Sequence, residues 1–348
     1  MTDSVVANSP YPHTVLIQSG GDLVGDALHK LPFLRALRAS FPNSRLVYLA
    51  RRTPTAFAGS LRPLAEPYLD EIHNPPGNWW RLAKLGWRVR PDLVLDTQRV
   101  VHFGLSLRLM VPFGRWITPI AKFRWSAAKP ADGSGRLPSR HHVYWLLDLV
   151  QLASGAADRA PLSYGCTLPP ELVAQAAALL PDAGVGQGAP IIGLAPGAGA
   201  RRKCWPLDRY LDLAKVMQER GYRVAWILGP NESDWLNQVR GAQPQALFPL
   251  QDAADRGWAP SPLLTIALAQ RFAVGVANDS GVGHMLAVAN CPLVSLFGPT
   301  DPGKFSPVTE RLSIVRFDPT EPALALPSIV AAVENWVKAP VHNTVTPS

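Results

Sequence analysis

The sequence predicts an α/β protein made of two doubly wound parallel domains. Short apolar runs of strand length alternate with helical patterns along the chain. Small or polar residues follow several of these runs, at the edge where an open parallel sheet binds its ligands. The length of 348 residues, with 47% hydrophobic and 17% charged residues, suits two domains with large cores.

The first half begins with a predicted strand over residues 14–18 and a turn-rich loop over residues 19–26. A helix follows from Asp26 to about Ser40, because leucines recur there at helical spacing despite Pro32. Further along we expect strands over 45–50 and 92–96, a loop over 128–140 and a helix over 141–152.

The second half shows the same alternation more regularly. Strands are predicted over 191–195, 223–228, 273–277 and 293–297, and helices over 206–215, 232–239, 262–270 and 281–289. Ser328 is expected to cap a last helix that runs to about Lys338. We place the first domain at residues 1–175, the second at 186–325, and a C-terminal helix with a flexible tail at 326–348.

The net charge of +8 is unevenly distributed. Residues 1–170 hold 20 Lys/Arg and 11 Asp/Glu, whereas residues 171–348 hold 14 and 15. The two halves are therefore expected to meet different partners. An anionic partner of the first half could be nucleic acid, a membrane surface or an acidic small substrate.

Hydropathy and cysteine content limit the class of protein further. We expect no membrane-spanning segment, since even the apolar residues 143–153 include Asp148 and Gln151, and no signal peptide, since residues 1–14 lack a basic region followed by an apolar stretch. The three cysteines lie far apart, without metal-ligand spacing, and suit a reducing cytoplasm: Cys166, Cys204 and Cys291.

The loop of residues 196–206 is a candidate phosphate site. Gly197, Ala198 and Gly199 leave backbone N–H groups free to face an anion, and the cations Arg201, Arg202 and Lys203 follow. It is not a P-loop, because no Gly-Lys-Ser/Thr follows the glycines. A solvated turn is the alternative.

A second candidate is the segment of residues 278–284. Asp279, Ser280 and Gly281 lie between a predicted strand and a helix, with His284 close behind. An acid, a hydroxyl and glycines at a helix N-terminus suit a phosphate or a sugar hydroxyl. The alternative is a helix that Asp279 or Ser280 merely caps, with a structural histidine.

Two further acidic residues lie shortly after predicted strands. Asp26, after Gly25, could act as a general base on an attacking sugar hydroxyl, with Asp22 as its rival and an N-cap as the alternative role. Glu232 could accept hydrogen bonds from a ribose diol, or be a first-turn helix acid. Nothing in the sequence has metal-ligand spacing, a GxGxxG fingerprint or a Gly-x-Ser-x-Gly elbow.

Residues 74–90 combine tryptophans with the cations Arg81, Lys84 and Arg88. Such a segment suits an anionic surface, whereas the alternative is that the tryptophans pack in the core.

Three blocks together resemble glycosyltransferase family 9, the heptosyltransferase-like enzymes. Gly25-Asp26 with Leu31-Pro32 resembles the first family signature. Pro196-Gly197-Ala198 with residues 203–206 resembles the second, and residues 278–281 with His284 and residues 297–300 the third. Ser280 stands where the family more often has threonine, and residues 55–165 match no motif.

The resemblance implies a GT-B architecture, in which two Rossmann-like domains face a central cleft. It implies an inverting, metal-independent transfer of heptose from ADP-heptose to a hydroxyl of the lipopolysaccharide core, with no cofactor. Asp26 would be the base and Lys203 would hold the diphosphate. The donor would also contact Gly197, Ala198, Glu232, Asp279, Ser280, Gly281 and His284.

The acceptor implied is an anionic glycolipid, contacted by Gly25, Arg81, Lys84 and Arg88. We therefore expect a cytoplasmic monomer, peripheral on the inner membrane, that does not bind nucleic acid. Another nucleotide sugar or glycan acceptor is the main alternative, and the roles of Arg201 and Arg202 stay open. A non-catalytic nucleotide- or nucleic-acid-binding protein is the lesser alternative, because the basic surplus is confined to one half.

Overall fold

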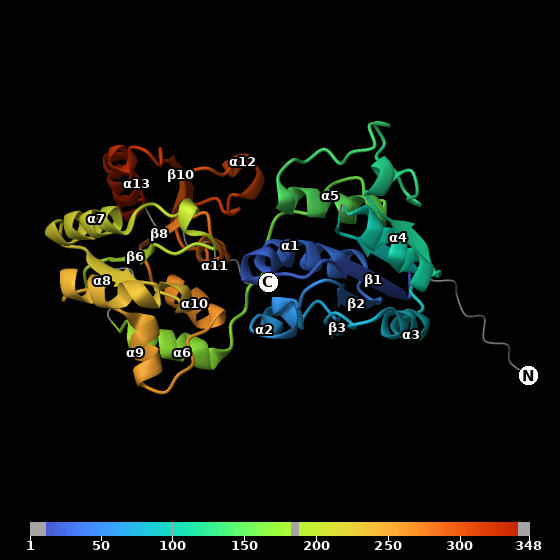
Figure 1. Ribbon diagram of the computed structural model, residues 1–348, viewed down its shortest axis with the longest axis horizontal. Helices are drawn as coiled ribbons and strands as arrows, with labels where there is room; N and C mark the ends of the chain where they lie inside the picture. The colour runs from blue at the N-terminus through green and yellow to red at the C-terminus, as the bar shows by residue number, and fades with distance from the viewer. Residues whose placement is uncertain (1–11, 99, 182–187, 340–348) are drawn as a thin grey trace, which may run out of the picture. The chain divides into compact units, whose positions relative to one another are not determined.

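The computed structural model describes residues 12–98, 100–181 and 188–339, which divide into two compact units (Figure 1). Unit 1 ends at Thr167 and unit 2 begins at Leu168. In these described ranges, no helix combines the length and the hydropathy needed to cross a membrane.

Unit 1 contains a five-stranded sheet in the order β3-β2-β1-β4-β5, with every pair parallel. The chain starts at the central strand, winds outward through β2 and β3, then returns to add β4 and β5. The switch point of this doubly wound sheet therefore lies between β1 and β4. The strands are β1 (Thr14–Ser19), β2 (Arg45–Ala50), β3 (Glu71–His73), β4 (Leu93–Asp96) and β5 (Arg115–Ile117).

Helices cover both faces of this sheet. Leu16, Val47 and Val94 face the layer formed by α3 and α4, in one apolar cluster with Leu82 and Leu107. The opposite face carries α1, which contacts α2 and α5. The helices are α1 (Val24–Ser40), α2 (Arg62–Ala65), α3 (Trp79–Val89), α4 (Val101–Met110) and α5 (His142–Ser154).

Unit 2 repeats this plan with the strand order β10-β9-β8-β6-β7, again all parallel. The chain winds from β6 to β7 and then back to β8, so the switch point lies between β6 and β8. The strands are β6 (Ile191–Ala195), β7 (Arg223–Trp226), β8 (Val274–Asn278), β9 (Leu293–Phe297) and β10 (Leu312–Arg316).

The main core of unit 2 lies between one sheet face, α7 and α13. It includes Trp205, Tyr210 and Trp226, which are fully buried, together with Ile329 and Val333 of α13. The helices are α6 (Pro170–Leu179), α7 (Leu207–Glu219), α8 (Leu236–Ala242), α9 (Pro249–Asp255), α10 (Pro262–Ala269), α11 (Gly281–Val288), α12 (Pro302–Phe305) and α13 (Leu326–Lys338).

The structure differs from the sequence expectations in several places. Helices α3 and α4 and strands β3, β5 and β10 were not predicted. The first domain was predicted to end at residue 175, but the units divide after Thr167. Helix α6, which contains residue 175, packs on α10 within unit 2. The predicted cap Ser328 is wrong, because α13 starts at Leu326 after Ala325. The predicted flexible tail falls largely on residues 340–348, outside the described residues.

Candidate functional site

The loop of residues 196–206 follows β6 at the switch point of unit 2, where open α/β sheets bind ligands. The buried amide of Asn278, at the end of β8, holds both ends of this loop. Its Nδ2 donates to the carbonyl of Pro196 at 2.7 Å, and its Oδ1 accepts from the Trp205 N–H at 2.9 Å. Asn278 is thus a positioning residue that fixes the loop against the neighbouring strand.

Lys203 points from this loop to the first residue after β8. Its Nζ lies 2.9 Å from Oδ2 of Asp279, whose side chain is 7% exposed against 29% for the lysine. The pair joins the two loops that border the switch point. A cation is therefore held at the edge where a ligand phosphate would lie.

Arg201 and Arg202, which the sequence left without roles, differ in their contacts. Arg201 donates to both carboxylate oxygens of Asp234 at 2.9 and 3.0 Å and to the carbonyl of Asn231. Its guanidinium also stacks on the Trp235 ring, 3.8 Å from the centroid. Arg201 therefore ties the loop to the segment after β7, whereas Arg202 is exposed.

Glu232 lies in that segment after β7, against the glycine of the loop. Its Oε2 accepts the N–H of Gly229 at 3.0 Å, and a Cβ added to Gly197 would lie 2.3 Å from its Oε1. A larger residue at 197 would displace this carboxylate from its present position. Burial raises the pKa of Glu232 above its ordinary value. Ala198 follows at the same edge and is half-buried.

Helix α11 starts at the same edge, so its N-terminal N–H groups face the loop side of the sheet. Ser280 caps it by accepting the N–H of Gly283, which agrees with the capping role considered from the sequence. Gly281 is half-buried in the first turn, and His284 is buried one turn further along. The structure thus gathers most of the predicted donor residues at one edge of unit 2.

In unit 1 the structure separates the two rival aspartates. Asp22 is buried and accepts hydrogen bonds from Lys30 at 2.5 Å, Tyr48 at 2.6 Å, and Ser19 and Thr55 at 3.0 Å. Burial alone would raise the pKa of Asp22, but the Lys30 charge and these bonds hold it below its ordinary value. The Asp22 carboxylate is thus engaged by four side chains of unit 1.

Asp26 is exposed in the first turn of α1, next to half-buried Gly25. It is not the N-cap, because Leu23 occupies that position without a side-chain hydrogen bond. The loop before it meets the loop after β4, since a Cβ on Gly20 would lie 2.9 Å from Oε1 of Gln98. Asp26 therefore lies beside the switch point of unit 1, where a general base could reach a bound hydroxyl.

The predicted acceptor cations Arg81, Lys84 and Arg88 all lie on the exposed side of α3. Arg88 also pairs with Glu71 at 2.9 Å. Trp80 and Trp87 on the same helix are 66% and 55% exposed, so the alternative that these tryptophans pack in the core is wrong.

Sequence reasoning missed a pocket of ≈ 340 Å³ at the carboxyl edge of unit 1. Arg51 and Arg52, directly after β2, line it together with Asn78, Trp79 and Ser106. The Arg51 guanidinium donates to Oγ of Ser106 at 3.2 and 3.3 Å. Two arginines directly after a buried strand were the available signal, because they place paired cations at the ligand-binding edge.

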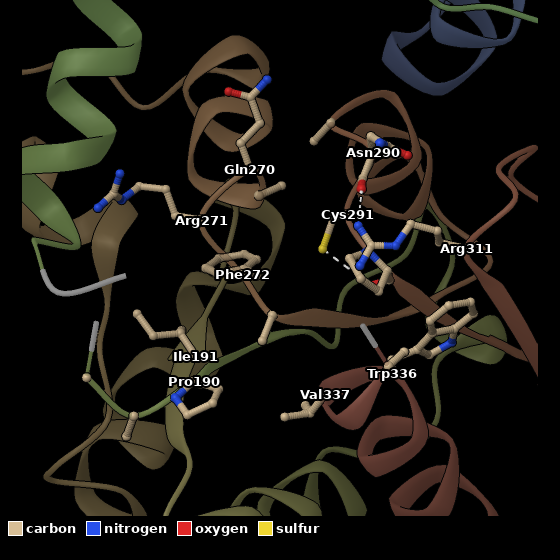
Figure 2. Close-up of a pocket in the computed structure, with 17 residues that line it drawn as sticks. Pro190, Ile191, Gln270, Arg271, Phe272, Asn290, Cys291, Arg311, Trp336 and Val337 are labelled. Carbon is tan, nitrogen blue, oxygen red and sulfur yellow. Dashed lines mark hydrogen bonds between the residues drawn. The ribbon is translucent and has the colours of Figure 1, made fainter. Parts of the chain in front are cut away.

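Another pocket, of ≈ 320 Å³, lies at the amino ends of the unit 2 strands (Figure 2). Its arginines hold main-chain carbonyls: Arg271 donates to Leu180 at 2.9 Å and Arg311 to Asn290 at 3.5 Å. Burial raises the pKa of its Cys291 to about 12, so the thiol stays protonated. This pocket is on the opposite edge from the predicted donor residues.

Comparison with known proteins finds a family match in unit 2. Residues 166–328 match the family model of glycosyltransferase family 9 (heptosyltransferase). Unit 2 is thus similar to glycosyltransferase family 9 over most of its length. The resemblance seen in the sequence is thereby confirmed.

The chain is also similar in sequence to individual heptosyltransferases. Over 131 residues the chain is 34% identical to lipopolysaccharide heptosyltransferase 2 of Escherichia coli, a stretch covering 36% of each chain. This match thus spans about a third of that relative's length. Over 297 residues it is 26% identical to lipopolysaccharide heptosyltransferase 1 of Pseudomonas aeruginosa, covering 80% of this chain and 77% of the relative.

A solved structure extends the likeness to the whole fold. The E. coli ADP-heptose lipopolysaccharide heptosyltransferase II aligns with a TM-score of 0.65 at 18% identity, covering 93% of this chain and 98% of that one. The predicted α/β fold of the GT-B class is confirmed. The cleft expected from the sequence stays a prediction.

Proposed function

We propose that this protein is an inverting, metal-independent glycosyltransferase that moves a heptose from ADP-heptose to a hydroxyl of an anionic lipopolysaccharide-core acceptor. One observation carries the proposal: Gly197, Glu232, Lys203 and Asp279 meet at the carboxyl edge of a domain similar to family 9. The names of the relatives support the choice of heptose, ADP and lipopolysaccharide.

In the donor half of the reaction, Lys203 stabilises the negative charge that develops on the leaving diphosphate when the bond to the anomeric carbon breaks. Glu232 accepts hydrogen bonds from the ribose hydroxyls. Asp279, Ser280, Gly281 and His284, with Ala198, line the pyrophosphate and the sugar. Lys203 thus supplies the positive charge that a metal ion provides in other transferases.

In the acceptor half, Asp26 takes the proton of the acceptor hydroxyl as its oxygen bonds to the anomeric carbon. Gly25 keeps the backbone beside Asp26 open, and Arg81, Lys84 and Arg88 bind anionic groups of the acceptor. The pocket of Arg51 and Arg52 suits a phosphate or carboxylate of the same molecule. We place this reaction on a monomer at the cytoplasmic face of the inner membrane.

The test has two stages. First, thermal melting with ADP, UDP and GDP identifies the nucleotide, since a ligand of the folded state raises the midpoint. We expect ADP to raise it most; a preference for UDP or GDP would favour the alternative of another nucleotide sugar, and no response to any of them would contradict the proposal.

Second, transfer from ADP-heptose to a lipopolysaccharide-core acceptor is followed by the acceptor's mass, with and without a metal chelator. We expect Asp26→Asn to bind ADP normally but to transfer about 10²–10⁴-fold more slowly. Glu66→Gln, which changes another exposed acid of unit 1, is the matched control and should transfer normally. Undiminished turnover of Asp26→Asn would remove Asp26 from the mechanism, and loss of activity with the chelator would overturn metal independence.

A further inference from the structure

The outer faces of α3 and α4 carry large apolar side chains that the fold leaves in solvent. Trp80 and Trp87 of α3 are 66% and 55% exposed, and Leu105 and Leu109 of α4 are 46% and 69% exposed. We call these four residues the outer patch. Large apolar side chains left exposed on neighbouring helices are a feature of interaction sites.

The geometry of the helices shows that the outer patch faces away from the sheet. Leu82 and Val89 of α3, Leu107 of α4, and Val111 directly after α4 pack in the core against the strands. Because successive helical residues turn by about 100°, Leu105 and Leu109 lie on the side of α4 opposite Leu107. Trp80 and Trp87 likewise lie opposite Val89. Both helices thus carry large apolar side chains on their outer as well as their inner sides, and on α3 the outer tryptophans lie beside Lys84 and Arg88.

The two helices also share one layer. They contact each other and together cover one face of the unit 1 sheet (Figure 1, teal). Their lengths are 11 and 10 residues, too short to span a bilayer. Helices of this length with exposed Trp and Leu can lie in the plane of a membrane interface.

The charge of the chain segment that carries the outer patch favours an anionic occupant. Residues 74–129 contain ten Lys/Arg and two Asp/Glu, and one of the two acids, Asp96, is fully buried. Lys84 and Arg88 follow Trp80 and Trp87 on the exposed side of α3, where long cationic side chains reach lipid phosphates. A symmetric contact between two copies through this surface would set the same cations against each other.

We infer that the outer patch docks unit 1 on an anionic lipid bilayer, with its four side chains at the boundary between headgroups and acyl chains. The inference deepens the proposed function and rests on it for the membrane-anchored acceptor. Docking itself requires neither donor nor transfer, so it can be tested separately.

The experiment is co-sedimentation of the full chain with vesicles of phosphatidylcholine alone or mixed with phosphatidylglycerol. The wild type is expected to bind the mixed vesicles and not the neutral ones. The double variant Leu105→Ser, Leu109→Ser removes apolar surface while keeping every cation, and its partitioning should fall by about tenfold or more. Leu324→Ser, which changes a leucine of unit 2 that is 73% exposed, is the matched control and should bind like the wild type.

Further measurements separate the outcomes. ADP binding and the melting midpoint should be the same in the double variant and the wild type, which shows that the fold and the donor site are intact. Equal vesicle binding by both proteins, or no binding by the wild type, overturns the inference. So does size-exclusion chromatography that shows a dimer dissociated by the double variant, because the outer patch would then be a subunit interface. Vesicle binding without any transfer activity would instead contradict only the proposed function.

Discussion

The ammonium group of Lys203 lies 2.9 Å from the carboxylate of Asp279, although the two residues are 76 positions apart in the chain. The pair connects the loop after β6 with the loop after β8, on the two sides of the unit 2 switch point. Lys203 is consequently held in place before any ligand binds. Such preorganised charge costs no rearrangement when a diphosphate arrives.

The first prediction concerns this cation. Lys203→Ala should weaken ADP binding by about 10- to 100-fold, since a hydrogen bond to a charged group contributes about 1.5–3 kcal/mol. Isothermal titration calorimetry measures the change. Arg202→Ala, which removes an exposed cation one residue away, should change the affinity by less than about twofold. Equal losses in both variants would mean that only the general positive charge of the loop matters.

The second prediction concerns the close approach of Gly197 to Glu232. Gly197→Ala adds a Cβ that would lie 2.3 Å from Oε1 of Glu232, so the carboxylate or the loop must move. We expect ADP affinity to fall by about tenfold, the cost of one displaced hydrogen-bonding group. Gly199→Ala is the matched control, because no atom lies within 4 Å of its added Cβ.

A double variant makes this prediction sharper. If Gly197→Ala acts through Glu232, its effect should largely disappear when Glu232→Ala is already present, since contacting residues are not additive. Full additivity of the two losses in calorimetry would show that the glycine acts on the ligand in another way.

The third prediction separates the two aspartates of unit 1. Lys30→Met leaves the buried Asp22 carboxylate without its cation and should lower the free energy of unfolding by about 3–5 kcal/mol. Asp26→Asn changes an exposed residue and should cost less than about 0.5 kcal/mol. Urea unfolding measures both.

The pH dependence of the Lys30 effect has a definite sign. The folded-state pKa of Asp22 is lowered, so its ion pair stabilises the protein above the unfolded-state pKa of about 3.9 and loses this effect as the pH falls. The loss of unfolding free energy caused by Lys30→Met, relative to the wild type, should therefore become smaller as the pH falls. A deficit that is constant between neutral and acidic pH would contradict the structural role of the pair.

The fourth prediction concerns Asp96, at the carboxyl end of β4. Its carboxylate accepts hydrogen bonds from Gln18, Gln98 and Thr118, each at 2.9 Å. Burial nevertheless raises its pKa to about 6. A raised folded-state pKa favours the protonated form, so this stabilising contribution is complete below about pH 3.9 and is lost as the pH rises through 6.

Asp96→Asn removes this titration while keeping the shape of the side chain. Between pH 4.5 and 7.5 the free energy of unfolding of the variant should rise relative to the wild type by about 2 kcal/mol, since each pKa unit corresponds to about 1.4 kcal/mol and part of the shift is already lost at pH 4.5. Urea midpoints at the two pH values test it. A stability difference that does not change with pH would show that Asp96 titrates at its ordinary pKa.

Much of the fold followed from local sequence patterns. Strands such as β6 and β9 were predicted residue for residue, because parallel strands buried on both faces are continuous apolar runs. The sequence also located Lys203, Asp279 and Glu232 after strand ends, where the topology of a parallel sheet collects its ligand-binding residues.

The same reasoning missed α3 and α4 for a physical reason. Their outer sides carry Trp80, Trp87, Leu105 and Leu109, so apolar residues occupy both sides of each helix. In α4 the period of 3.6 residues, which reveals a surface helix by its polar side, is therefore weak, whereas in α3 the cations Arg81, Lys84 and Arg88 recur at helical spacing and were an available signal. Leu105 and Leu109, which weaken the period of α4, belong to the outer patch that we assign to the membrane surface.

The sequence by itself determined the class of fold, the family resemblance and the residues at each strand end, since these depend on neighbours within a few positions. Tertiary structure alone decided the pairing of Lys203 with Asp279, the hydrogen bonds of Asn278 to both ends of the loop, and the burial of Asp22 beside Lys30. These contacts depend on strand order, because the sheet places β6 beside β8 and β1 beside β2. Hydrogen bonds act only at contact distance, and sequence spacing does not specify which distant groups reach it.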